Sequence, residues 1–131
     1  MKTNSKLELI YKIQQSDLAK YLSKDPSDSF PEVFATSRMI AIMELAAARL
    51  MKSELTDQQL SVGVNVNVTH IAATPENEEV KVIAIFTGMK GKLYQFDVEL
   101  YDKGGKAGFG THTRAIVDTQ RLVAGAIQRV R

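Results

Sequence analysis

The chain has 131 residues, of which 44% are hydrophobic and 24% charged, the size and composition of one globular domain rather than a disordered segment. Lys and Arg number 17 against 15 Asp and Glu, and no long basic run occurs, so neither nucleic acid nor a membrane is an expected partner. The absence of cysteine excludes disulfides, a thiolate nucleophile and Cys-ligated metals, and two histidines exclude an all-histidine metal site. We therefore expect one domain over residues 1–131, without a bound metal. The N-terminal residues lack an apolar signal segment, which favours a cytoplasmic location.

The first half of the chain predicts one strand and two helices. Apolar residues alternate over residues 6–13, which favours a strand, and Ser16 suits the N-cap of a short helix that ends near residue 22. After a loop, Thr36 or Ser37 is a natural N-cap for a long helix that continues to residue 51. This helix is rich in alanine and apolar on nearly every side, so we expect it to be buried.

The second half changes to the period of two that is typical of strands. Alternating patterns predict strands over residues 61–71, 79–88, 93–101 and 107–117, followed by a short amphipathic helix over residues 123–130. In the first of these strands, one face carries Val62, Val64, Val66, Val68 and His70, and the other carries Gly63, Asn65, Asn67 and Thr69. Short connections imply antiparallel pairing, so the predicted fold class is α+β, an antiparallel sheet wrapped around one long helix.

Glu44 is the residue least expected in an apolar helix. A buried carboxylate must be paired, protonated or functional. The structural alternative is a Glu44 at a dimer interface or facing solvent through a gap, with a salt bridge to Arg38 or Arg49. His70 ends the valine face of its strand, where a lone histidine is usually structural. Together, a carboxylate and an imidazole are the minimum for acid–base or hydrolytic chemistry near neutral pH.

Three further residues are candidates for the same site. Thr36 lies two helical turns before Glu44, so both can face one cleft, although a threonine at a helix start is most often a cap. Gly63 interrupts a β-branched strand, which marks a bulge or a close backbone approach. Arg114 shares a strand face with His112 and can pair with a carboxylate or hold an anionic group.

An ordered set of short motifs carries a resemblance to a known family. The motifs are Phe30-Pro31-Glu32-Val33 with Ala35-Thr36, Met43-Glu44, Ser61-Val62-Gly63, Val68-Thr69-His70 with Ala72-Ala73-Thr74-Pro75, and Gly110-Thr111-His112 with Arg114. They run in one order from about residue 30 to residue 117. In these motifs the chain resembles the hotdog-fold thioesterases, and most closely their fluoroacetyl-CoA thioesterase-like branch.

The resemblance implies a hotdog fold, a homodimer or dimer of dimers, and acyl-CoA thioester hydrolysis at the dimer interface. It implies a catalytic set of Thr36, Glu44 and His70. It also implies that Gly63 lines the site near the thioester carbonyl and that Arg114 lies near the substrate. Phe30 would belong to a small lid. No cofactor is implied, because coenzyme A enters as part of the substrate.

Two departures bear on the acyl group. Ser27 stands where the fluoroacetyl-specific enzyme has a second lid aromatic, and Leu45 stands where its helix has an aromatic. A short-chain acyl group without selectivity for fluorine is therefore expected. Lys90 and Lys92, with Arg114, are candidates to hold the phosphates of CoA. The alternatives are a non-catalytic acyl-CoA sensor and an enoyl-thioester hydratase or dehydratase on the same fold.

Overall fold

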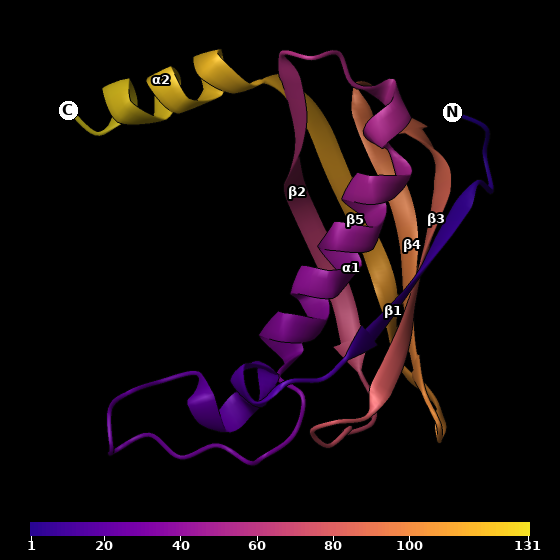
Figure 1. Ribbon diagram of the computed structural model, residues 1–131. Coiled ribbons are helices and arrows are strands. Elements are labelled where there is room, and N and C mark those ends of the chain that lie inside the picture. Colours follow the sequence, from indigo (N-terminus) through magenta and orange to yellow (C-terminus); the bar gives the residue numbers. More distant parts are fainter.

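The computed structural model describes all residues from 1 to 131 and shows one antiparallel sheet curved around a long helix (Figure 1). In chain order the elements are β1 (Lys6–Lys12), the 3₁₀ turns η1 (Gln15–Asp17) and η2 (Ala19–Tyr21), α1 (Thr36–Leu50), the 3₁₀ turn η3 (Lys52–Glu54), β2 (Gln59–His70), β3 (Glu79–Lys90), β4 (Leu93–Asp102), β5 (Gly105–Asp118) and α2 (Thr119–Arg129). The five strands lie in the order β1-β3-β4-β5-β2. The predicted α+β class, with an antiparallel sheet around one helix, is confirmed.

The core lies between the concave face of the sheet and one side of α1. Alternate residues of β3 and β4 point inward, as the period of two requires, and meet the helix. The fully buried members from these elements are Met39, Met43, Ala46, Ala47, Val80, Val82, Ala84, Phe96, Val98 and Leu100. The two alanines of α1 allow the helix backbone to lie close to the sheet. This close packing fixes the distance between α1 and β2, the two elements that carry the candidate site residues.

The prediction that α1 is buried on every side is wrong. Only one side faces the core, and the side chains of Glu44 and Leu45 are 42% and 40% exposed. This open side adjoins β2, the last strand of the sheet, whose outer edge has no partner strand. The open side of α1 and the free edge of β2 therefore form one seam, along which the polar residues of interest lie.

The start of α1 is held by a buried carboxylate and not by the predicted threonine or serine cap. Ala35 is the N-cap, and its backbone N–H donates to the backbone carbonyl of Asp17. The Asp17 carboxylate accepts hydrogen bonds from the Tyr11 hydroxyl at 2.6 Å, the Gln14 N–H at 2.8 Å and Arg38 Nε at 2.9 Å. Burial alone would raise the pKa of this carboxyl, but the three donors outweigh it and hold the pKa below its usual value.

A β-bulge in β2 overturns the predicted valine face. Gly63 pairs with Arg114 of β5, but the next pair joins Asn65 to Thr113, so Val64 has no opposite residue. The bulge puts Gly63 on the helix-facing side with Val66, Val68 and His70, while Val62 lies on the outer side opposite Ala115. The proposal that Gly63 marks a bulge or a close approach is confirmed, since it does both.

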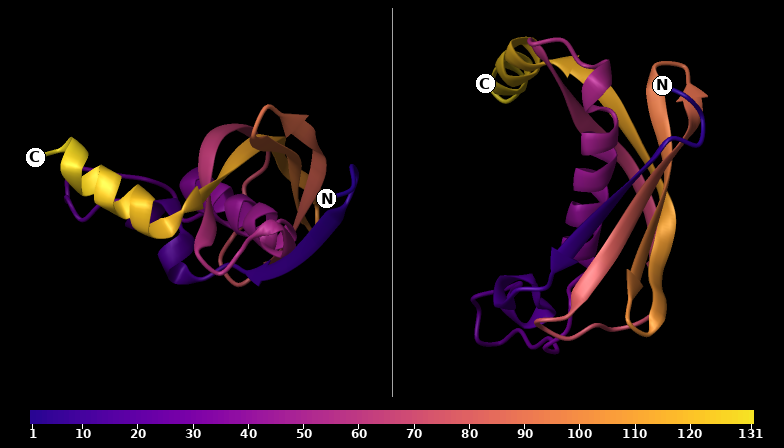
Figure 2. Two further views of the ribbon diagram at one scale, coloured as in Figure 1. Left: turned by 90° about the horizontal axis from the view of Figure 1, so that it is seen from above. Right: turned by 45° about the vertical axis from the view of Figure 1, so that its right-hand side comes forward.

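The first and the last predicted helices of the chain also differ from the structure. The helix predicted after Ser16 is two 3₁₀ turns, because Leu18 between them is extended. At the C-terminus, Asp118 accepts a hydrogen bond from the Arg121 N–H and caps α2, which therefore starts four residues before the predicted position. Figures 1 and 2 show α2 projecting away from the sheet, and all its residues except Thr119 are exposed.

Candidate active site

The first polar cluster lies where the start of α1 meets the end of β2. Thr36 is the first helical residue, so its hydroxyl is free of a capping role and forms a 2.9 Å hydrogen bond with His70 Nδ1. Both side chains line a cavity of about 310 Å³ whose other lining residues are small or apolar: Ala19, Pro31, Val33, Phe34, Ala35, Ile71, Ala72 and Ala73. This cluster is a hydroxyl–imidazole pair beside an apolar cavity.

His70 is partly withdrawn from solvent. Its ring meets the Phe34 ring edge-on, with centroids 6.4 Å apart, and its Nε2 is buried without a hydrogen-bond partner. Burial lowers the pKa of His70 below its usual value, so the imidazole is neutral at neutral pH. A neutral imidazole with one free ring nitrogen can take or give a proton, which is the property that acid–base chemistry needs.

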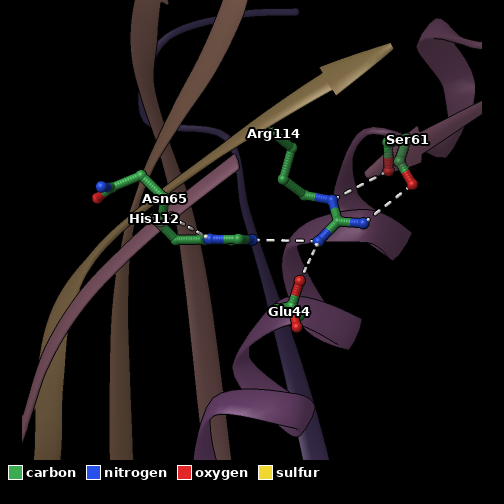
Figure 3. A network of polar contacts seen from close by, with 5 residues as sticks. All are labelled: Glu44, Ser61, Asn65, His112 and Arg114. Atoms are coloured by element: carbon green, nitrogen blue, oxygen red, sulfur yellow. Dashed lines mark hydrogen bonds and ion pairs between the residues drawn. The ribbon is translucent and has the colours of Figure 1, made fainter. Parts of the chain in front are cut away.

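The second polar cluster is built around Arg114 of β5 (Figure 3). Its Nη1 donates to Glu44 Oε1 at 3.1 Å and to His112 Nε2 at 3.1 Å. Its Nε donates to Ser61 Oγ at 3.0 Å, and its Nη2 donates to the Ser61 carbonyl at 3.1 Å. Arg114 is only 6% exposed, so these partners, and not water, must stabilise its positive charge.

Gly63 forms the seat of the Glu44 carboxylate. A Cβ at position 63 would overlap Glu44 Oε1 and lie 3.3 Å from His112 Cε1. Only glycine therefore allows the carboxylate to lie against β2 while it contacts Arg114. Oε1 is thus occupied, whereas Oε2 makes no hydrogen bond within the chain and points to no protein donor.

The geometry joins some of the predicted site residues and separates others. Thr36 contacts His70, and Glu44 contacts Arg114 and the backbone of Gly63, but no hydrogen bond links the two clusters. Thr36 and Glu44 are eight residues apart in α1, which is about 12 Å along a helix axis. The alternative pairing of Glu44 with Arg38 or Arg49 is wrong. Arg38 instead contacts Asp17.

The remaining candidates lie apart from both clusters. Phe30 is 46% exposed in the loop before α1 and does not line the cavity beside His70. Lys90 ends β3 and Lys92 lies in the turn before β4, and neither lines that cavity. No group of three or more His, Asp or Glu side chains is arranged to hold a metal ion, and no helix has the length and apolarity needed to cross a bilayer.

Sequence reasoning did not assign roles to three residues of these clusters. Ser61 and His112 hold Arg114, and Phe34 contacts His70. His112 was placed on the same strand face as Arg114, which was the available signal, because residues two apart on a strand are neighbours on one face. For Phe34 the signal was its position two residues before Thr36. Ser61 belongs to the motif Ser61-Val62-Gly63, but its contact with Arg114 depends on strand register, which the motif does not indicate.

Comparison with known proteins agrees with the fold and with the family that the motifs resemble. A family model for the fluoroacetyl-CoA-specific thioesterase FlK matches residues 13–120. The fluoroacetyl-CoA thioesterase of Streptantibioticus cattleyicolor is 37% identical over 100 residues, which cover 76% of this chain and 72% of that protein.

Solved structures give the same result. A variant of FlK in complex with acetyl-CoA superposes with a TM-score of 0.93 at 29% identity and covers 100% of both chains. A hot-dog-like protein from Thermanaerovibrio acidaminovorans superposes with a TM-score of 0.83 at 20% identity, covering 97% of this chain and 91% of that one. The architecture is thus the hotdog fold. Within it, the chain belongs to the fluoroacetyl-CoA-specific thioesterase family.

Proposed function

We propose that the protein hydrolyses the thioester of a small acyl-CoA to the free acid and CoA, with Thr36, Glu44 and His70 as the catalytic residues. The observation that carries this proposal is the seam between α1 and β2. It holds a carboxylate with one free oxygen and, further along, a hydroxyl–imidazole pair beside an apolar cavity. Family membership supports the thioesterase reaction.

We infer that a complete site needs two subunits. One chain leaves Glu44 about two helical turns from Thr36, too far for both to contact one thioester. If two copies of β2 pair antiparallel along their length, His70 at the end of one strand lies opposite the start of the other. That start carries Ser61 and Gly63, which adjoin Glu44. Such a homodimer would bring Glu44 of one subunit toward the Thr36–His70 pair of the other.

The free carboxylate oxygen is the reactive atom of this proposal. Glu44 Oε2 either attacks the thioester carbon to form a mixed anhydride with loss of the CoA thiolate, or takes a proton from an attacking water. In the first route, water then hydrolyses the anhydride. The CoA thiolate leaves as the anion. In the first route neutral His70 accepts a proton from the water that hydrolyses the anhydride and passes it to the thiolate, and in the second route protonated Glu44 returns the proton of the water to the thiolate. Thr36 orients His70 or the thioester carbonyl. Arg114 holds Oε1, which leaves Oε2 as the oxygen that faces the substrate.

The lining of the cavity bears on the acyl group. A volume of about 310 Å³ lined by alanine, proline and valine side chains suits a short apolar chain. Ser27 and Leu45 depart from the aromatic residues that the resemblance to the fluoroacetyl-specific branch implies at these positions, so fluorine selectivity is not expected. Variants of FlK have been crystallised with acetyl-CoA and, in another structure, with fluoroacetate and CoA. The proposed chemistry uses no cofactor, because CoA enters as part of the substrate.

The test is free-thiol release from a panel of acyl-CoAs of increasing length, including acetyl-CoA and fluoroacetyl-CoA. Wild-type protein is expected to release thiol fastest from the short members. Glu44→Gln is expected to abolish turnover while CoA binding, measured by calorimetry, is retained. Tight binding of acyl-CoA without turnover by the wild type would contradict the proposal and indicate a sensor. Unchanged turnover in Glu44→Gln would exclude the role of the carboxylate.

A further inference from the structure

His112 is a deeply buried histidine to which the proposed reaction gives no role. Its side chain is 2% exposed, at the centre of β5, with the Phe96 ring 6.3 Å away. Both ring nitrogens are engaged: Nδ1 lies 2.8 Å from the backbone carbonyl of Asn65, and Nε2 lies 3.1 Å from Arg114 Nη1 (Figure 3). Any histidine buried this deeply needs such partners, so the informative feature is their identity, which is a backbone carbonyl at one nitrogen and the Arg114 guanidinium at the other.

These two partners determine where the proton of His112 lies. A backbone carbonyl only accepts, so Nδ1 must carry the proton and donate to Asn65. A guanidinium only donates, so Nε2 must be unprotonated and accept from Arg114. The ring is therefore the neutral Nδ1–H tautomer. Burial lowers the pKa of His112, and the positive Arg114 beside it lowers the pKa further, which keeps this form at neutral pH.

We propose that neutral His112 is a positioning residue that orients Arg114, so that Arg114 Nη1 holds Glu44 Oε1 and leaves Oε2 free for the reaction. The inference rests on the proposed function, since it concerns the carboxylate of that site. Ser61 fixes the Nε and Nη2 side of the guanidinium. His112 is the neutral acceptor on the Nη1 side, and without it Nη1 has only the half-exposed Glu44 to hold it.

The β-bulge is the reason that this chain of contacts can form. The strand irregularity between Gly63 and Asn65 lets the Asn65 carbonyl accept from His112 while Gly63 makes room for Glu44. The charged groups that face His112 are Arg114 from its own strand and Glu44 from α1. The neighbouring β2 and β4 contribute Asn65 and the apolar ring of Phe96. Arg114 is the donor at the centre of this chain: Nη1 donates to Glu44 on one side and to His112 on the other, and His112 in turn donates to the Asn65 carbonyl.

Two variants separate the two hydrogen bonds of the ring. His112→Gln keeps a carbonyl oxygen near the Nε2 position that can accept from Arg114, whereas His112→Asn keeps a donor near Nδ1 for Asn65 but offers nothing to Arg114. We expect His112→Asn to lower kcat roughly tenfold to a hundredfold with KM changed less than about threefold, and His112→Gln to stay within about threefold of wild type. Equal kcat values for both variants would overturn the proposal.

Nuclear magnetic resonance of the imidazole nitrogens tests the arrangement in wild-type protein without an activity assay. The expected spectrum is that of a neutral His112 with the proton on Nδ1, and an Nε2–H tautomer or an imidazolium would overturn the proposal. The Arg114 Nε–H is expected to exchange slowly in wild type and His112→Gln, and faster in His112→Asn. These readouts hold even if the protein hydrolyses no thioester, so failure of this inference is distinguishable from failure of the proposed function.

Discussion

Replacement of Gly63 by alanine is the sharpest test of the Glu44 seat, because it adds one methyl group where the carboxylate lies. The added Cβ would overlap Glu44 Oε1, whereas ordinary van der Waals contact begins at 3.4 Å. The backbone of Gly63 has no positive φ angle, so alanine fits the strand itself. The carboxylate must therefore retreat by about 1 Å or swing away from Arg114.

The expected loss falls on turnover and not on stability. A misplacement of about 1 Å in a reacting group costs roughly a hundredfold in rate, which is about 2.7 kcal/mol of transition-state stabilisation. Weakening the ion pair through a carboxylate that is 42% exposed costs about 1 kcal/mol, because Ser61 and His112 still hold the buried Arg114. Alanine in place of glycine within a strand returns about 0.5–1 kcal/mol. The two stability effects nearly cancel, so kcat and the melting temperature should separate.

The assay is kcat and KM for the best acyl-CoA of the panel, with melting temperature measured on the same samples. Gly125→Ala in α2 is the matched control, because a Cβ there meets nothing within 4 Å. It should leave kcat unchanged, and any change in melting temperature should be a small rise, because alanine is the better helix former. If Gly63→Ala keeps kcat within about twofold of wild type and melts at the same temperature, the position of Glu44 against β2 does not matter for catalysis, and the reasoning fails.

Three further predictions concern the shared site, the α1 anchor and pH. Mixed Glu44→Gln and His70→Ala subunits, each inactive alone, are expected to recover about one quarter of wild-type activity, because half the dimers are mixed and each mixed dimer keeps one intact shared site. No recovery despite verified subunit exchange would place the whole site within one chain. Asp17→Asn is expected to lower the free energy of unfolding by about 2 kcal/mol in urea titration, because an amide accepts less strongly from the three buried donors. A loss under about 0.5 kcal/mol would contradict that role. Below pH about 6.5 the unfolded chain binds a proton at His112 that the folded protein resists, so stability falls with pH there. His112→Gln should weaken this dependence, and an unchanged slope would count against it.

The strands, the long helix and most of the buried faces can be predicted from the sequence, because each depends on an apolar pattern that repeats over many residues. Alternation along β3 and β4 predicts their buried faces, and the core confirms it. The valine face of β2 fails for a specific reason. A bulge exchanges the two faces of a strand at one residue, and the side-chain pattern contains only Gly63 as a sign of where this happens. A glycine indicates that the strand is irregular, but it does not indicate at which residue the two faces exchange.

The contacts between side chains of the site depend on strand register and on the position of α1, so the local sequence pattern does not predict them. Arg114 was expected either to pair with a carboxylate or to hold an anion, and only the fold shows that its partner is Glu44, seventy residues away. The role of Thr36 could not be predicted from the sequence either. Threonine at a helix start usually caps, but Asp17 and Ala35 already hold this helix start, so the Thr36 hydroxyl is free for His70.

The exposed position of Glu44 strengthens the argument for a site shared by two subunits. In a lone chain the carboxylate is 42% exposed, and water screens its attraction to Arg114. Pairing of the free β2 edge would cover the seam beside the exposed Val64 and Leu45. The attraction between charges at about 4 Å rises from about 1 kcal/mol in water to about 4 kcal/mol at the effective dielectric of a protein surface. In the proposed dimer, assembly would therefore bring the Thr36–His70 pair to Glu44 and, in the same step, hold Oε1 more firmly on Arg114.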